Sequence, residues 1–145
     1  MSVKLLSVLG FVCMVAGIVA LIRTDSLLSH RLPVITVQAA AVLLMIWARV
    51  TFGGRSFHLG ADPTEGELVT NGPYRWIRHP IYTAVCLFVW AAVLASLSIA
   101  TLSAALVATA GALVRMVAEE RLLAATFAGY PEYAARTSRM IPGVF

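Results

Sequence analysis

The residues best suited to chemistry stand in the stretch Asn71–Tyr82, which holds two arginines, a histidine and two tyrosines within twelve residues. Arg78 lies three residues beyond Arg75, and His79 directly precedes Pro80, which disfavours helical backbone at the histidine. A helix that begins at Pro80 would present unpaired N–H groups and the positive end of its dipole, and both suit a carboxylate or phosphate. The stretch therefore predicts an anion-binding loop. The alternative is an anchoring loop, whose arginines and tryptophan only sit in the membrane interface.

A second polar group follows the last long apolar run. Glu119 and Glu120 are adjacent there, where their mutual repulsion and the negative end of a helix dipole are both unfavourable. Binding of a cation, an ammonium group or ribose hydroxyls would relieve this strain, although Arg115 could simply pair with Glu119 at i,i+4 spacing. Four further residues recur every three positions and would share one helix face, which could bind a ligand or lie on lipid headgroups: Tyr130, Tyr133, Arg136 and Arg139.

The elements that must position these groups are membrane helices. The chain of 145 residues is 60% hydrophobic and 12% charged, against about 25% charged in soluble domains. Four apolar runs predict a single all-α membrane domain over 1–145, with spans at about 5–22, 32–52, 81–97 and 99–117. The first run is long for a signal peptide, so we expect a retained helix. The fourth helix meets no stop before Gly129 and should extend over about 30 residues, into water. A short amphipathic helix should follow from Tyr130.

Four spans would place both termini, the 53–79 loop and the C-terminal tail on one side. Nine of the eleven Lys and Arg residues would lie on that side, and only Arg23 and Arg31 on the other. The positive-inside rule then predicts cytoplasmic termini in a cell membrane. These positive charges are scattered rather than grouped, which excludes a nucleic-acid patch. No metal site is predicted, because Cys13 and Cys86 both stand in apolar runs.

The order and spacing of the polar motifs also carry a family resemblance. The matching residues are Gly72-Pro73-Tyr74, Arg78-His79-Pro80, Tyr82, Glu119-Glu120, Phe127, Tyr130, Tyr133, Arg136, Arg139 and Pro142, preceded by Gly54-Arg55-Ser56 and Leu68-Val69. In these positions the chain resembles the isoprenylcysteine carboxyl methyltransferase and phospholipid methyltransferase group of integral membrane enzymes. The resemblance covers roughly residues 53–142.

This resemblance implies S-adenosylmethionine as methyl donor and S-adenosylhomocysteine as product. It implies a lipophilic acceptor, either a prenylcysteine-like carboxylate or a lipid headgroup. It also implies two catalytic residues, Arg78 and Arg139. The implied cofactor-binding residues are Tyr74, His79, Pro80, Tyr82, Glu119, Glu120, Tyr133 and Arg136.

The residue chemistry agrees with such a ligand. Carboxylates suit an ammonium or ribose hydroxyls, arginine suits a carboxylate, and tyrosine rings suit adenine and a sulfonium cation. The chain has no Gly-x-Gly and no alternation of strands and helices, so a Rossmann site is excluded. Two other functions stay open: an NADPH-dependent membrane enzyme related to sterol reductases, and a non-catalytic adaptor that binds anionic lipids.

Overall fold

The computed structural model describes residues 2–53 and 68–145, and this part of the chain is helical without a regular strand. The elements in chain order are α1 (Val3–Arg23), α2 (Leu32–Phe52), η2 (Gly72–Arg75), α3 (Pro80–Ala95), α4 (Ile99–Thr126) and α5 (Tyr130–Arg136). The predicted all-α membrane class is confirmed. The loop residues 54–67, among them Gly54-Arg55-Ser56 and the charge of Arg55, lie outside the described residues.

The helix boundaries follow local signals in the sequence. The Ser2 side chain accepts a hydrogen bond from the Leu5 N–H at the start of α1, and Ser98 forms a capping box with Thr101 at the start of α4. Pro80 occupies the first turn of α3, where its missing N–H costs nothing. The helix α4 has 28 residues, about 42 Å at 1.5 Å per residue. It therefore exceeds a hydrocarbon core of about 30 Å, as its uninterrupted sequence predicts.

Three helices in the described part of the chain are long and apolar enough to cross a membrane: α1, α2 and α4. The helix α3 is apolar but has only 16 residues, fewer than the roughly 20 that a span commonly needs. A crossing by α3 stays a prediction.

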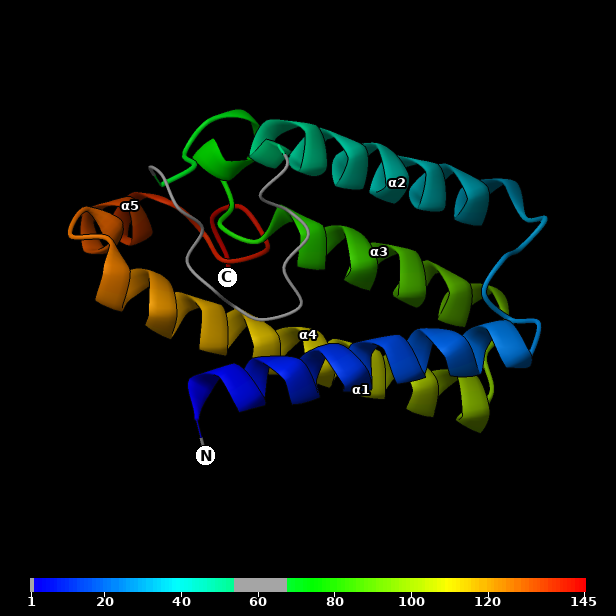
Figure 1. Ribbon diagram of the computed structural model, residues 1–145. Coiled ribbons are helices and arrows are strands. Elements are labelled where there is room, and N and C mark those ends of the chain that lie inside the picture. The colour runs from blue at the N-terminus through cyan, green and yellow to red at the C-terminus, as the bar shows by residue number, and fades with distance from the viewer. Residues whose placement is uncertain (1, 54–67) are drawn as a thin grey trace.

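The four long helices lie side by side, with α1 packed against α4 and α2 against α3 (Figure 1). The short connections α1–α2 and α3–α4 lie at one end of this bundle. The N-terminus, η2, α5 and the C-terminus lie at the other end (Figure 1). The expected meeting of the loop and the tail is therefore confirmed, and this polar end of the bundle holds the candidate site.

Small residues allow α1 to approach α4 closely. A Cβ atom built on Gly10 would lie 2.7 Å from the Gly111 carbonyl oxygen and 2.9 Å from the Arg115 nitrogen. Gly17, one heptad further along α1, meets the backbone of Ala104 and Ala108 in the same way. The sequence predicts a close helix contact on this face, and the structure identifies the neighbour as α4. This contact fixes the helix that carries Glu119 and Glu120.

We expect Gly10→Ala to lower the stability of the protein by about 1–3 kcal/mol, because overpacking a close contact forces backbone shifts. Gly129→Ala is the matched control, since a Cβ atom there meets nothing within 4 Å. Thermal unfolding in detergent compares the two variants. Equal melting temperatures would show that α1 and α4 are not packed in this way.

Candidate functional site

The C-terminal tail pairs with the loop before α3 through backbone hydrogen bonds. Ile77 and Ser138 form a parallel bridge. The Arg78 N–H donates to the Ser138 carbonyl at 2.8 Å, and the His79 N–H donates to the Arg139 carbonyl at 2.9 Å. Two segments about 60 residues apart are thereby locked together at the start of α3.

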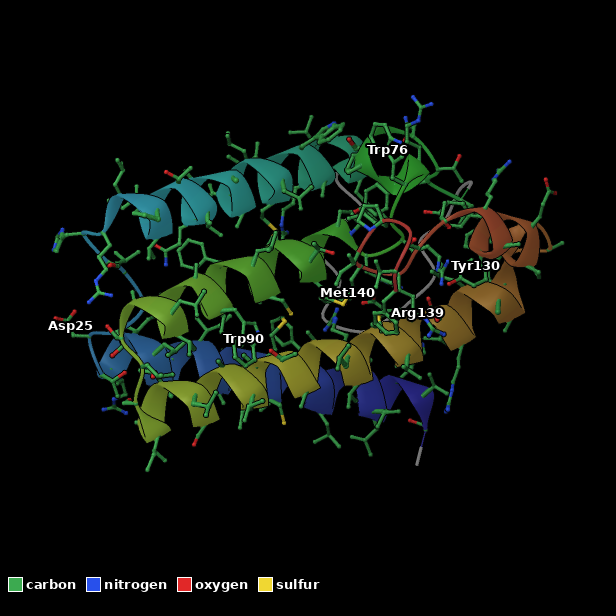
Figure 2. The ribbon with its side chains drawn as sticks, turned by 180° about the vertical axis from the view of Figure 1, so that it is seen from behind. Asp25, Trp76, Trp90, Tyr130, Arg139 and Met140 are labelled. Atoms are coloured by element: carbon green, nitrogen blue, oxygen red, sulfur yellow. The ribbon has the colours of Figure 1, made fainter. Side chains whose placement is uncertain are left out.

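This pairing corrects the predicted helix face. The helix α5 ends at Arg136 and Thr137 is extended, so Arg139 lies beyond the helix and cannot share its face. Tyr130 and Tyr133 are buried, whereas the Arg136 side chain is 64% exposed and lies 3.9 Å from Glu132. The tail turns Arg139 inward, and Figure 2 shows Arg139, Met140, Tyr130 and Trp76 gathered at one end of the bundle.

Glu120 is the centre of a charged cluster. Its carboxylate accepts hydrogen bonds from the Arg78 Nε at 3.0 Å and from the Arg139 Nε at 3.0 Å. The His79 Nε2 lies 3.4 Å from the same carboxylate. Burial raises the pKa of Glu120, but hydrogen bonds from His79 and Arg78 and the charges of these two residues outweigh burial and lower the pKa to about 2. The carboxylate is therefore ionised throughout the physiological range.

Glu119 has partners of its own. It accepts a hydrogen bond from the Tyr82 hydroxyl at 2.5 Å and one from the Arg115 Nε at 3.1 Å. The same Arg115 Nε lies 2.7 Å from the Tyr82 hydroxyl oxygen, and its guanidinium stacks over Phe11. Both glutamates thus have partners within the protein, and the i,i+4 pair of Arg115 and Glu119 is formed. Adjacent helical residues point about 100° apart, so each carboxylate reaches a different set of partners.

His79 lies between the two carboxylates. Its Nε2 faces Glu120 and its Nδ1 is 3.9 Å from Glu119. Its ring stacks on that of Tyr82 with centroids 5.7 Å apart, and its backbone caps α3 ahead of Pro80. The imidazole therefore lies between the two acidic groups, within hydrogen-bond distance of Glu120 and farther from Glu119.

Arg78 holds the site together rather than projecting freely. In addition to Glu120, it donates through Nη1 to the Ala134 carbonyl at 2.8 Å and to the Thr137 carbonyl. One guanidinium thus joins the loop, α4, α5 and the tail. Whether this residue also touches a ligand stays a prediction.

The remaining predicted residues line the same end of the molecule. The Tyr133 hydroxyl donates to the Tyr74 carbonyl at 2.7 Å, and the Tyr74 ring packs against Phe52 with centroids 5.6 Å apart. Burial and the nearby tyrosine raise the pKa of both phenols above its usual range. Both tyrosines therefore stay neutral and support the loop.

Sequence reasoning missed the contribution of Thr137 and underrated that of Arg115. The Arg115–Glu119 spacing signals an ordinary helix pair, and only the fold reveals Tyr82 as its third member. Thr137 accepts hydrogen bonds from Arg78 through its backbone carbonyl and its hydroxyl, and a single threonine in the tail carries no sequence signal for this. Within the described residues, no group of His, Cys, Asp and Glu side chains is arranged to hold a metal ion.

Fold and site together define an integral membrane protein that gathers charged and aromatic groups at one end of an all-α bundle. The family model for phospholipid methyltransferases matches residues 34–129. The chain therefore belongs to the phospholipid methyltransferase family, a group of membrane methyltransferases, as its motifs predict. The matched range contains the loop, His79, Tyr82 and both glutamates, and it ends just before α5.

One similar protein adds a further comparison. The nickel-cobalt-cadmium resistance protein NccN of Alcaligenes xylosoxydans xylosoxydans is 34% identical over 100 residues, which cover 67% of this chain and 42% of the relative. The chain thus matches less than half the length of that relative. No solved structure matches the chain.

Proposed function

We propose that this protein transfers a methyl group from S-adenosylmethionine to a lipophilic acceptor at the membrane interface. The observation that carries the proposal is the cluster of Arg78, His79, Tyr82, Glu119 and Glu120, which assembles inside the region matched by the family. A family match by itself would not require these side chains to meet. Their convergence at the end of a membrane bundle supports a shared site.

The donor set fits the chemical groups of the methyl donor. The two carboxylates suit its ammonium and ribose hydroxyls, and a guanidinium suits its carboxylate. The rings of Tyr82 and His79 offer an aromatic surface for the adenine or the sulfonium, the latter by cation–π attraction. When bound, S-adenosylmethionine supplies an electrophilic methyl group on a positively charged sulfur. Tyr74, Pro80 and Tyr133 are proposed to shape the pocket around it, and the exposed Arg136 is not.

The chain's own residues would act mainly by positioning. An in-line displacement needs the nucleophile and the methyl group to be aligned, and such alignment can supply roughly 7–11 kcal/mol of the barrier. Arg78 and Arg139 are proposed to orient an anionic acceptor beside the site. The partly buried cluster also excludes water, which strengthens each electrostatic contact.

An apolar cavity supports a lipophilic acceptor. A cavity of about 180 Å³ lies between α1, α2 and α3. Its wall includes Ile18 of α1, Met45 of α2, and Ala84 and Phe88 of α3. Ala84 is two residues from Tyr82, about 3 Å along the axis of α3 and about 200° around it. The cavity therefore lies beside the charged cluster in depth but on another face of α3.

The proposed setting is a cell membrane, with both termini and the charged end in the cytoplasm. The basic residues at the polar end support this orientation through the positive-inside rule. The interface also suits Trp47 and Trp76, which form an edge-to-face pair 5.9 Å apart.

The alternatives receive less support. The family match favours methyl transfer over an NADPH-dependent reductase. An adaptor that only binds lipids would not need His79 between two carboxylates.

Methyl transfer can be tested with the purified protein, labelled S-adenosylmethionine and a total lipid extract. We expect label in the organic phase, in a product that mass analysis identifies as a methyl ester or a methylated headgroup. Heat-inactivated protein is the control. Absence of labelled lipid across extracts that contain acidic, amine and prenylated lipids would contradict a lipophilic acceptor.

A further inference from the structure

Arg115 is a charged side chain that is buried where α1, α3 and α4 meet. The residue is 7% exposed. Its Nε donates to the Tyr82 hydroxyl oxygen at 2.7 Å and to Glu119 at 3.1 Å. Desolvation of two buried charges largely offsets their attraction, so stability alone is a weak reason for such a pair. The contacts of Arg115 instead indicate that it holds other side chains in a fixed geometry.

Two consecutive residues of α1 determine where Arg115 lies. A Cβ atom on Gly10 would lie 3.2 Å from the Arg115 Cβ, so the absence of a side chain at Gly10 lets Arg115 lie against α1. The Phe11 ring packs on the guanidinium, with its centroid 5.0 Å from the Arg115 Cζ. An aromatic face attracts a cation, and more strongly when both are removed from water. A helix outside the family-matched range 34–129 therefore reaches the site through Arg115.

Arg115 and Tyr82 together restrain the Glu119 carboxylate. Their hydrogen bonds to Glu119 both end on Oε1. The last torsion of a glutamate side chain has a broad preference, so these two bonds are what set the plane of the carboxylate. The other oxygen, Oε2, lies 3.9 Å from the His79 Nδ1, beyond hydrogen-bond distance. Because the Glu119 side chain is 24% exposed, a ligand can reach this oxygen.

We propose that Arg115 is a positioning residue, which orients Glu119 so that its Oε2 accepts a hydrogen bond from S-adenosylmethionine. The hydrogen bond comes from either the ammonium group or a ribose hydroxyl. Arg115 acts through Glu119 and does not touch the ligand itself. A carboxylate that is already oriented costs less to order when the ligand binds. This inference rests on the proposed function, and it adds a residue that the sequence motifs do not include.

A double-mutant cycle tests whether Arg115 acts through Glu119. The full chain in detergent is titrated with S-adenosylhomocysteine as wild type, Arg115→Gln, Glu119→Gln and the double variant, at a temperature at which all four are folded. Arg121→Gln is the matched control, because Arg121 is an exposed arginine of the same helix and the change removes the same charge.

We expect Arg115→Gln and Glu119→Gln each to weaken binding about tenfold. The double variant should bind within about twofold of Glu119→Gln, since residues of one network are not additive. Arg121→Gln should bind as the wild type does. A residue that only stabilised the fold would lower the melting temperature and leave the affinity of the folded protein unchanged, so the coupling in affinity reports positioning.

Phe11→Leu gives a second test that leaves every charged residue in place. Leucine keeps an apolar side chain on α1 but offers no aromatic face to the Arg115 guanidinium. We expect binding of S-adenosylhomocysteine to weaken about threefold. The same change should cause no further loss when it is added to Arg115→Gln, because Phe11 acts only through Arg115.

The part of the ligand that Glu119 contacts follows from a second titration with 5′-methylthioadenosine, which keeps the ribose and lacks the ammonium group. If the ammonium makes the hydrogen bond, Arg115→Gln should weaken binding of S-adenosylhomocysteine alone. If a ribose hydroxyl makes it, Arg115→Gln should weaken binding of both ligands equally.

Two results would overturn the positioning role: unchanged affinity in Arg115→Gln, or additive losses that reach about 100-fold in the double variant. Either result would leave the proposed function standing, because the wild type would still bind S-adenosylhomocysteine. Absence of binding by the wild type would instead contradict the proposed function, and this inference with it.

Discussion

Arg78→Lys should lose most activity and also destabilise the protein without ligand, whereas Arg75→Lys should be nearly silent. The guanidinium of Arg78 reaches Glu120, Ala134 and Thr137 in three directions from one plane. A lysine ammonium is a single point charge and cannot reproduce this fork. The buried carbonyls would lose their donors, at about 1–3 kcal/mol for each unsatisfied group. We therefore expect the free energy of unfolding to fall by about 2–4 kcal/mol. Activity should fall at least about 100-fold.

Arg75 is the matched control because it undergoes the same change in the same loop. Its guanidinium lies over the exposed ring of Trp76 at 4.8 Å, a contact that a lysine can largely keep. Melting temperature without ligand separates two roles for Arg78. A residue that only binds a ligand would leave the melting temperature unchanged, and a residue that joins four segments would lower it. Near-normal activity and stability in both variants would mean that this loop is only a membrane anchor.

Glu120→Gln should destabilise the protein by about 2–4 kcal/mol, because it leaves the mostly buried charge of Arg78 without its partner. The substitution keeps the size of the side chain but removes the counter-charge of Arg78 and Arg139. The Glu120 side chain is 14% exposed, so solvent can replace little of the lost interaction. Binding of S-adenosylhomocysteine should fall at least about tenfold, through the loss of both a ligand group and the ordering of two arginines.

Glu132→Gln makes the same chemical change at an exposed pair. Glu132 is 82% exposed and lies 3.9 Å from Arg136, so its loss should cost less than about 0.5 kcal/mol.

Unfolding at low pH provides a second test of the role of Glu120. The pKa of Glu120 is lowered from 4.5 to about 2, so its contribution is complete above about pH 4.5 and is lost as the pH falls through 2. The melting temperatures of the wild type and Glu120→Gln should therefore converge in acid. A constant difference down to pH 2 would show that the carboxylate charge is not what stabilises the cluster.

The fold was predictable because membrane helices require long apolar runs, which are visible in the sequence. The unbroken run after Ser98 predicts a helix that leaves the membrane, and α4 has this form. Gly10 predicts a close helix contact, and its distance to Gly111 confirms one. The end of α3 was not predictable from the apolar run, which continues to Leu97, whereas the helix ends at Ala95.

The sequence predicted that the loop and the end of the fourth helix would meet, but not which side chains would pair there. The motif residues identify His79, Arg78 and Glu120, but their pairing depends on the parallel bridge between Ile77 and Ser138. Backbone carbonyls and amides make that bridge, and the sequence of side chains does not reveal such backbone pairing. The three-residue spacing from Tyr130 to Arg139 wrongly predicted one shared helix face, because periodicity does not reveal where a short helix ends.

The central claim is that the cluster around Glu120 binds S-adenosylmethionine, and calorimetry on the detergent-purified protein tests it most directly. We expect saturable binding of S-adenosylhomocysteine at one site per chain, and no heat of binding from NADPH. Saturable binding of NADPH, or no binding of either nucleotide, would contradict the claim.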